Sequence, residues 1–318
     1  GSGIVVIKET TPKCASGVWS INDHFDQVKN SEWIARTMSV DYLVIAGGAG
    51  ATGCSTGGGG AGGYRTSGFG PSPLRGSTLS GPLSDFIGDH TITVGAGGAA
   101  GPASCQAGSN GNDSTFSTIT SAGGGRAGMI NSVGIAGGSG GGGTGTFPAS
   151  PGSSVATGGA GNTPPTDPPQ GNPGGTGFDG LVARTYGGGG GGAGAAGGNS
   201  SGPAPNGSAG AGGAGVANNI LGPCTTYAGG GGGTTNANNG QGASGGSGGG
   251  GAGANPGGSS GCANTGGGGG AGIANSGGGG TGGTGGSGIV VIRGPSAVTF
   301  AGSPTPARTL STHPGGDK

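Results

Sequence analysis

Short groups of strand-forming residues alternate with runs of glycine along most of the chain. The pattern is clearest in "DYLVIAGGAG" (41–50), "TITVGAGG" (91–98), "TITSAGGG" (118–125), "ARTYGGGGGGAG" (183–194) and "TTYAGGGGG" (225–233). Tyrosine, threonine and the β-branched aliphatic residues favour β-strands, whereas glycine weakens both strands and helices. The sequence therefore predicts many short strands between residues 41 and 293, each leading into a segment with a different backbone conformation.

The glycine runs carry a prediction of their own. Four to six consecutive glycines occur at 57–60, 140–143, 187–192, 229–233, 248–251, 266–270 and 277–280. A flexible linker is the simplest interpretation of one run, but linkers are not interrupted at intervals by strand-forming and aromatic residues. Six glycines in the polyproline-II conformation would span about 18 Å, with every N–H and C=O group pointing outward. Several such helices could bond to one another only where no side chain intervenes.

The composition favours this ordered bundle over an ordinary domain. The 318 residues include 97 glycines and 20 prolines, and only 29% of the chain is hydrophobic. So few large apolar side chains cannot build the usual core of a chain this long. We therefore expect a glycine-rich fold without a globular core: a bundle of polyglycine-II helices flanked by short β-strands, with backbone hydrogen bonds as its main source of cohesion.

Residues 10–40 differ from the rest, because they hold both tryptophans and repeat apolar residues at helical spacing. Ser20 and Asp23 resemble a helix-capping box, which predicts one short N-terminal α-helix over roughly residues 21–30. Its apolar side chains would pack it against a neighbour; these are Trp19, Phe25 and Trp33. His24 stands between two aspartates, but a polar helix face explains it more simply than catalysis does, since no nucleophile is near it in the sequence.

One strand-like sequence occurs twice. "GSGIVVIKE" spans residues 1–9, and "GSGIVVIRG" spans residues 286–294. Either the first copy closes a preceding unit in a tandem array, or the two copies pair as strands that flank the bundle. The expected organisation has four parts: a strand at 1–9, a connector for attachment at 10–40, the glycine-rich domain at 41–293 and a Pro/Thr-rich tail at 294–318.

Charge and cysteine content argue against several classes of function. The 11 basic and 11 acidic residues leave no net charge, so the chain offers no basic surface for nucleic acid. No apolar run is long enough to insert into a membrane. The cysteines form no C-x-x-C pair, so we expect neither a metal nor a cofactor. Two disulfides and small buried thiols both remain compatible with their positions, which are Cys14, Cys54, Cys105, Cys224 and Cys262.

One short motif suggests an enzyme but fails in its context. Gly48-x-Gly50-x-x-Gly53 follows a strand-like segment with the spacing of a dinucleotide-binding fingerprint. No helical pattern follows it, and the next acidic residue is Asp85, too far on to bind a ribose. The three histidines are also far apart and belong to no catalytic triad. We therefore expect no enzymatic activity.

Taken in order, these segments resemble a known family. "DYLVIAGGAG" leading to "GGGGAGGYRTS", then "TITVGAGG", "GSNGNDSTFSTITSAGGG", "TYAGGGGG" and a closing "GGSGIVVIR" look like the glycine-rich domain common in phage tail-fibre proteins. The preceding "ASGVWSINDHF" is similar to a segment that often comes before that domain. The resemblance covers about 41–293 and implies a polyglycine-II sandwich related to the distal tail-fibre adhesins of T-even-like phages. The chain departs from that family in its insert at 66–90 and in its C-terminal tail.

The resemblance implies a non-enzymatic virion protein of the tail fibre that recognises and adheres to the host cell surface. Its partners would be a host receptor (a glycan or an outer-membrane protein), other tail-fibre subunits and further copies of itself, since trimers are common in the family. A structural subunit of a fibre shaft or extracellular filament is the alternative. An ice-binding protein is a third, although its threonines look scattered along the sequence.

The candidates for receptor contact are the rare aromatic and charged residues in loop-like segments. Aromatic rings stack on sugars or apolar surfaces, while arginine suits carboxylate or phosphate groups. Packing of each side chain against the scaffold is the alternative. The candidates are Phe69, Arg75, Phe147, Phe178, Asp179 and Arg184.

Overall fold

The computed structural model describes residues 37–54, 56–82, 90–103, 106–145, 156–180, 184–201, 207–236, 241–275 and 278–295. The predicted helix over 21–30 lies outside these ranges, together with Trp19, Phe25, Trp33, the first copy of "GSGIVVI" and nearly all of the tail. The described ranges contain thirteen β-strands and no helix. No helix in them is therefore long and apolar enough to cross a membrane.

The chain divides into two compact units. The first comprises residues 1–39 and 80–89, and the second comprises residues 40–79 and 90–318. Within the first unit, the hydroxyl groups of Ser39 and Ser80 form a hydrogen bond of 2.6 Å. The second unit holds all the glycine runs.

One antiparallel sheet contains both the first and the last strand. β1 (Thr37–Ile45) lies between β13 (Ile289–Arg293) and β2 (Tyr64–Thr66), and β3 (Leu79–Pro82) also pairs with β1. Leu43 lies opposite Val291 on β13 and opposite Thr66 on β2. The last four residues of β1 are buried, which explains their continuous apolar sequence. The strands predicted from "DYLVI" and from the second "GSGIVVI" are confirmed.

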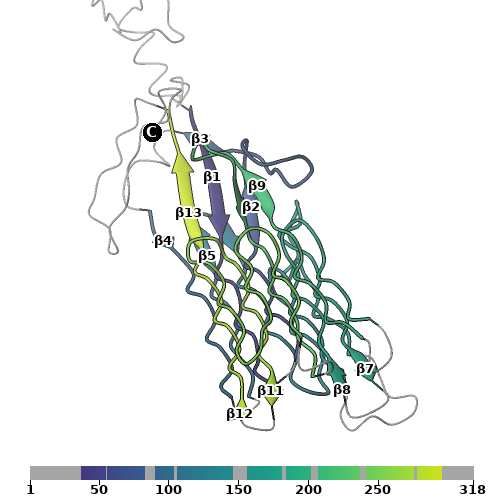
Figure 1. Cartoon of the computed structure of the whole chain (residues 1–318). Coiled ribbons are helices and arrows are strands. Elements are labelled where there is room, and N and C mark those ends of the chain that lie inside the picture. The colour runs from purple at the N-terminus through teal and green to yellow at the C-terminus, as the bar shows by residue number, and fades with distance from the viewer. Residues whose placement is uncertain are drawn as a thin grey trace, which may run out of the picture. The chain divides into compact units, whose positions relative to one another are not determined.

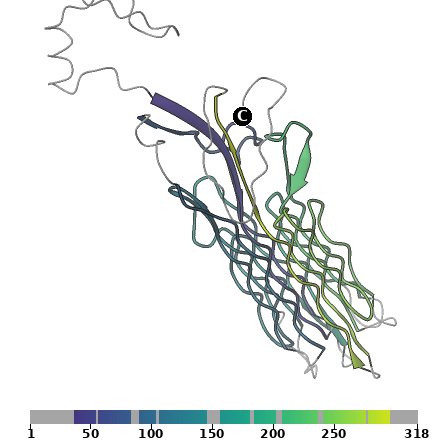
Figure 2. The ribbon, with the colours of Figure 1, turned by 90° about the vertical axis from the view of Figure 1, so that its left-hand side faces the viewer.

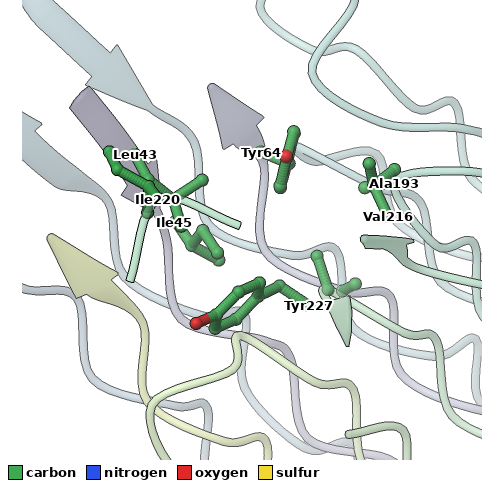
Figure 3. Close-up of a cluster of buried hydrophobic side chains, with 9 residues drawn as sticks. Leu43, Ile45, Tyr64, Ala193, Val216, Ile220 and Tyr227 are labelled. Carbon is green, nitrogen blue, oxygen red and sulfur yellow. The ribbon is translucent and has the colours of Figure 1, made fainter. Parts of the chain in front are cut away.

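A small apolar cluster lies beside this sheet (Figure 3). Leu43 and Ile45 enter it from β1, since alternate residues of a strand point to the same face. Its buried members are Leu43, Ile45, Ala61, Tyr64, Ala193, Val216, Ile220, Tyr227 and Ala228. A cluster of this size cannot hold together a unit of this length, so most of the cohesion has another source.

The remaining strands are short and antiparallel. β4 (Ile92–Thr93), β5 (Ser114–Phe116) and β6 (Ile119–Ser121) form one sheet in the order β4-β5-β6. The others form pairs: β7 (Phe178–Gly180) with β8 (Arg184–Tyr186), β9 (Val216–Asn218) with β10 (Thr225–Tyr227), and β11 (Ala274–Asn275) with β12 (Gly278–Gly279). The strands expected before the glycine runs at 91–98, 118–125, 183–194 and 225–233 are thereby confirmed.

The glycine segments run side by side as extended threads through the second unit (Figure 1 and Figure 2). The run at 187–192 lies inside this bundle, and all its residues are buried. The N–H group of Gly188 donates to Gly143, that of Gly189 to Gly198 and that of Gly190 to Gly231. Three consecutive residues thus bond to three different segments.

The direction of bonding repeats every three residues in this run. Gly191 donates to Gly140, in the same segment as the Gly143 that Gly188 reaches three residues earlier. The carbonyl groups are used in the same way, because those of Gly188, Gly189 and Gly190 accept from Gly58, Gly175 and Gly213. The run therefore has six neighbouring segments, three through its N–H groups and three through its C=O groups.

Only glycine fits in such a position. A β-carbon on Gly190 would overlap the carbonyl oxygen of Gly59, and one on Gly189 would overlap that of Ala211. The glycines of the supposed nucleotide motif have the same role. A β-carbon on Gly48 would overlap the carbonyl group of Gly267, and no helix follows within residues 46–54.

The cysteines do not share one state. Cys54 is buried and disulfide-bonded, whereas Cys224 and Cys262 are free and exposed. The expectation of small buried thiols is therefore wrong for Cys224 and Cys262, because both lie at the surface of the bundle. Cys14 and Cys105 lie outside the described residues.

Candidate functional site

The candidate contact residues fall at two opposite ends of the second unit. β1, β2, β9 and β13 lie at one end, and β7, β8, β11 and β12 lie at the other (Figure 1). Phe69 and Arg75 follow β2, whereas Phe178, Asp179 and Arg184 belong to β7 and β8. Phe147 lies outside the described residues. The structure therefore does not bring the candidates together on one surface.

Phe69 packs against the scaffold. It is half-buried against the apolar cluster, and the guanidinium carbon of Arg293 lies 4.3 Å from the centre of its ring. This is the geometry of a cation–π contact. Arg75 is exposed, and its guanidinium group donates a hydrogen bond of 3.3 Å to the carbonyl oxygen of Gly68.

The loop that carries Phe69 is fixed to β1 by one carboxylate. An oxygen of Asp41 accepts hydrogen bonds from the Ser67 hydroxyl at 2.5 Å and from the Gly68 N–H at 3.1 Å. The Ser67 hydroxyl oxygen in turn accepts from the N–H of Tyr42 at 2.9 Å. These bonds hold the loop at residues 67–68 against β1 at this end of the unit.

At the opposite end, β7 and β8 form a short hairpin. Asp179 pairs with Thr185, and Gly180 pairs with Arg184. The half-buried ring of Phe178 meets the buried ring of Tyr186 edge-on, with 6.5 Å between the ring centres. This contact fixes the base of the hairpin against the bundle.

A buried polar cluster near β2 was not foreseen from the sequence. The side-chain amide of Asn218 donates to the hydroxyl oxygens of Tyr64 at 2.9 Å and of Thr66 at 3.1 Å. Burial raises the pKa of Tyr64 above its ordinary value of 10.0, although the bond from Asn218 acts in the opposite direction. Burial also raises the pKa values of Tyr42 and Tyr227. All three tyrosines are buried and pack within the scaffold.

One flank of the bundle carries small side chains in register. Four neighbouring segments lie there in the order 106–112, 95–102, 281–288 and 257–263, joined by hydrogen bonds from Ser109 to Ala99, Gly285 to Gly98 and Gly261 to Thr284. Along the two middle segments the more exposed residue recurs at every third position. We call this the outer face; its exposed or half-exposed side chains are Gln106, Ser109, Asn112, Ala96, Ala99, Pro102, Thr281, Thr284, Ser287, Ser260 and Ala263.

The outer face changes one sequence-based expectation. Thr281 and Thr284 look scattered in the sequence, but the structure aligns them with each other and with the neighbouring segments. The Thr284 hydroxyl donates to that of Ser260 at 3.0 Å, and the Ser287 hydroxyl lies 3.3 Å from Asn264 Oδ1. No sequence signal reveals this alignment, because it depends on which segments are neighbours in the bundle and glycine has no side chain to mark one neighbour from another.

The part of the chain that the structure describes contains no group of three or more histidine, cysteine, aspartate or glutamate side chains that could hold a metal ion. Of the histidines, His90 is described and exposed, and His24 and His313 are not described. The described features that could serve a function are the bundle itself and the hairpins and loops at its two ends.

The comparison with protein families agrees with this architecture. A family described as the glycine-rich domain matches residues 27–295, so the chain belongs to the glycine-rich domain family. The comparison with curated proteins gives no match.

Proposed function

We propose that the glycine runs of this protein are polyglycine-II helices, packed so that each interior helix has six neighbours. The support is the three-residue period of bonding in the run at 187–192, because the polyproline-II conformation has three residues per turn. The same conformation explains why the more exposed residue recurs at every third position along the two middle segments of the outer face.

We further propose that this bundle is a non-enzymatic adhesin of a phage tail fibre, which binds the host cell surface. The observation that carries the proposal is the contrast between a bundle interior in which glycine backbones pack directly against one another and ends that hold the hairpins and loops. Function concentrates on loops that a rigid scaffold holds in place. The resemblance of residues 41–293 to tail-fibre domains supports the virion location.

Host contact is assigned to the end that carries β7 and β8. β1 leads from the first unit into the second, and β13, the last described strand, pairs with β1 at the other end. Connections to further fibre subunits, or to other copies in a homo-oligomer, therefore belong at the β1–β13 end. This leaves Phe178, Asp179 and Arg184 as the receptor-contact residues that we favour. Phe69 and Arg75 belong to the attachment end.

Gold-labelled antibodies against the protein, imaged on the native particle, test this proposal. Label at the far ends of virion fibres is the expected result. Label along a shaft or along a free filament would instead support the alternative of a structural subunit. Purified protein should also compete with the particle for adsorption to host cells, and failure to compete would contradict the adhesin function.

Ice binding is a second candidate, and the outer face is the observation that favours it. Its small polar and methyl-bearing side chains repeat along four adjacent segments. A thermal-hysteresis measurement decides this alternative. A freezing-point depression that is lost in Thr284→Lys would support it, and the absence of hysteresis would exclude it.

A further inference from the structure

Residues 1–8 repeat the strand that closes the sheet. "GSGIVVIK" and "GSGIVVIR" (286–293) are identical at seven of eight positions, and the eighth exchanges lysine for arginine. The second copy consists of residues 286–288 followed by β13. β13 pairs with β1 in the register that runs from Ile45 opposite Ile289 to Asp41 opposite Arg293. The environment of β13 shows what each repeated residue does.

The two glycines of the second copy are required by close backbone contacts. A β-carbon on Gly286 would overlap the carbonyl oxygen of Cys262. A β-carbon on Gly288 would overlap the carbonyl oxygen of Ile45 on β1. The first copy keeps glycine at both corresponding positions, 1 and 3.

The serine between these glycines also has a specific contact. The Ser287 hydroxyl oxygen accepts a hydrogen bond of 3.0 Å from the N–H of Asn264. At the other end of the strand, Arg293 places its cation over the ring of Phe69. The first copy has serine at position 2 and lysine at position 8, and a lysine cation can also bind over an aromatic ring.

Alternate apolar residues of the repeat match one face of the strand. Ile289 and Val291 pack against the apolar cluster beside β1. Ile4 and Val6 occupy the same positions in the first copy. Each residue of the second copy whose contact is described above therefore has an identical or similar residue at the same position of residues 1–8.

The edge of β1 in this unit is already occupied. β13 continues directly from a bundle segment whose N–H groups bond to two neighbouring segments: Gly283 and Gly286 donate to Gly270 and Gly267 of the run at 266–270, and Gly285 donates to Gly98. This anchoring holds β13 at the edge, so residues 1–8 are not needed there. A unit of the same design whose closing edge is vacant would accept them.

We propose that residues 1–8 are the closing strand of a second glycine-rich unit, and that they join this chain to that unit by antiparallel pairing with its β1 strand. The partner is thus another glycine-rich domain with the β1 frame of this one. Strand addition of this kind obtains affinity from main-chain hydrogen bonds and specificity from alternate side chains.

The full chain can be made into such an acceptor. Gly288→Val disables β13, and Gly3→Val disables the first copy in the same way. The double variant is then mixed with a synthetic peptide of residues 1–9. At a concentration about a hundredfold above its dissociation constant, the peptide should raise the melting midpoint by about 5–10 °C. The control is the same peptide carrying Gly3→Val, which should have no effect.

The four chains without peptide give the second readout: wild type, each single variant and the double variant. If residues 1–8 fit the edge, Gly3→Val will lower the melting midpoint in the Gly288→Val background and leave the wild-type background unchanged. If Gly3→Val is silent in both backgrounds and the peptide does not restore the double variant, the proposal is wrong. Coupling within the chain without rescue by the peptide would also contradict it, because residues 1–8 would then act only on their own unit.

Discussion

The side-chain amide of Asn218 donates a hydrogen bond of 2.9 Å to the hydroxyl oxygen of Tyr64, across 154 residues of sequence. Both residues are buried, and Asn218 also donates to Thr66 and accepts from the N–H of Ile220 at 2.8 Å. The bond joins β2 to the β9–β10 hairpin. It is a polar link beside the apolar cluster, to which Tyr64 also belongs.

Removal of the Tyr64 hydroxyl group should destabilise the fold. Tyr64→Phe leaves the Asn218 amide with one acceptor fewer in a buried site, so we expect the free energy of unfolding to fall by about 1–2 kcal/mol. Tyr186→Phe is the matched control, because the Tyr186 hydroxyl is buried and has no hydrogen-bond partner in the described structure. That variant should be as stable as the wild type or slightly more stable. Chemical denaturation measures both, and equal losses would contradict the role of Asn218.

The buried tyrosines predict a loss of stability at alkaline pH. The pKa of Tyr64 is raised above 10.0 in the folded protein by burial, so the folded state binds the phenolic proton more tightly than the unfolded state. This contribution is fully present below 10.0 and is lost as the pH rises through the folded pKa. Denaturant unfolding from about pH 8 to about pH 12 should show a fall in stability that is less steep in Tyr64→Phe. An unchanged slope in that variant would contradict the assignment.

Interior glycines should not tolerate even a methyl group. Gly190→Ala would push a β-carbon into the carbonyl group of Gly59 and should cost about 3 kcal/mol or more, since neighbouring backbone has no room to move. Gly257→Ala is the control, because the nearest atom to its β-carbon would be the Thr281 carbonyl oxygen at 3.3 Å. The control should remain within about 0.5 kcal/mol of the wild type. Similar denaturation curves for the two variants would show that the run at 187–192 is not packed as described.

Much of the local structure could be predicted from the sequence, and little of the assembly. The strands in the five quoted segments were recognisable because tyrosine, threonine and valine favour β-structure. The order of the runs in the bundle was not, because a glycine has no side chain to mark one neighbour from another. The run at 187–192 therefore gave no indication that Gly143, Gly198 and Gly231 would be its partners.

The positions of the candidate contact residues could also not be predicted from the sequence. Their residue types were visible in the sequence, but their distribution over two ends depends on which strands meet. Asn218 was not recognised, because a single asparagine within "VANN" carries no pattern that distinguishes a buried donor from a turn residue.

The two ends can be separated by one matched pair of substitutions. Arg184→Ala, on β8, should weaken binding of the purified protein to host cells by about tenfold or more, the effect of losing a strong interface residue. Arg75→Ala removes the same side chain at the attachment end and should leave binding unchanged. Both variants should keep wild-type melting midpoints. Loss of binding in Arg75→Ala alone would reverse the assignment of the receptor-binding end.

The most direct test of the account is amide hydrogen exchange of Gly187 to Gly192, measured by NMR on the full chain. The N–H groups of Gly187 to Gly191 donate to other segments of the bundle, and that of Gly192 donates to Ala195 in the turn that follows the run. The account predicts that all six exchange at least roughly a thousandfold more slowly than in an unfolded chain, with protection similar to that of β1. Exchange of these glycines at the rate of an unfolded chain, while β1 stays protected, would show that the runs are linkers and that the bundle does not exist.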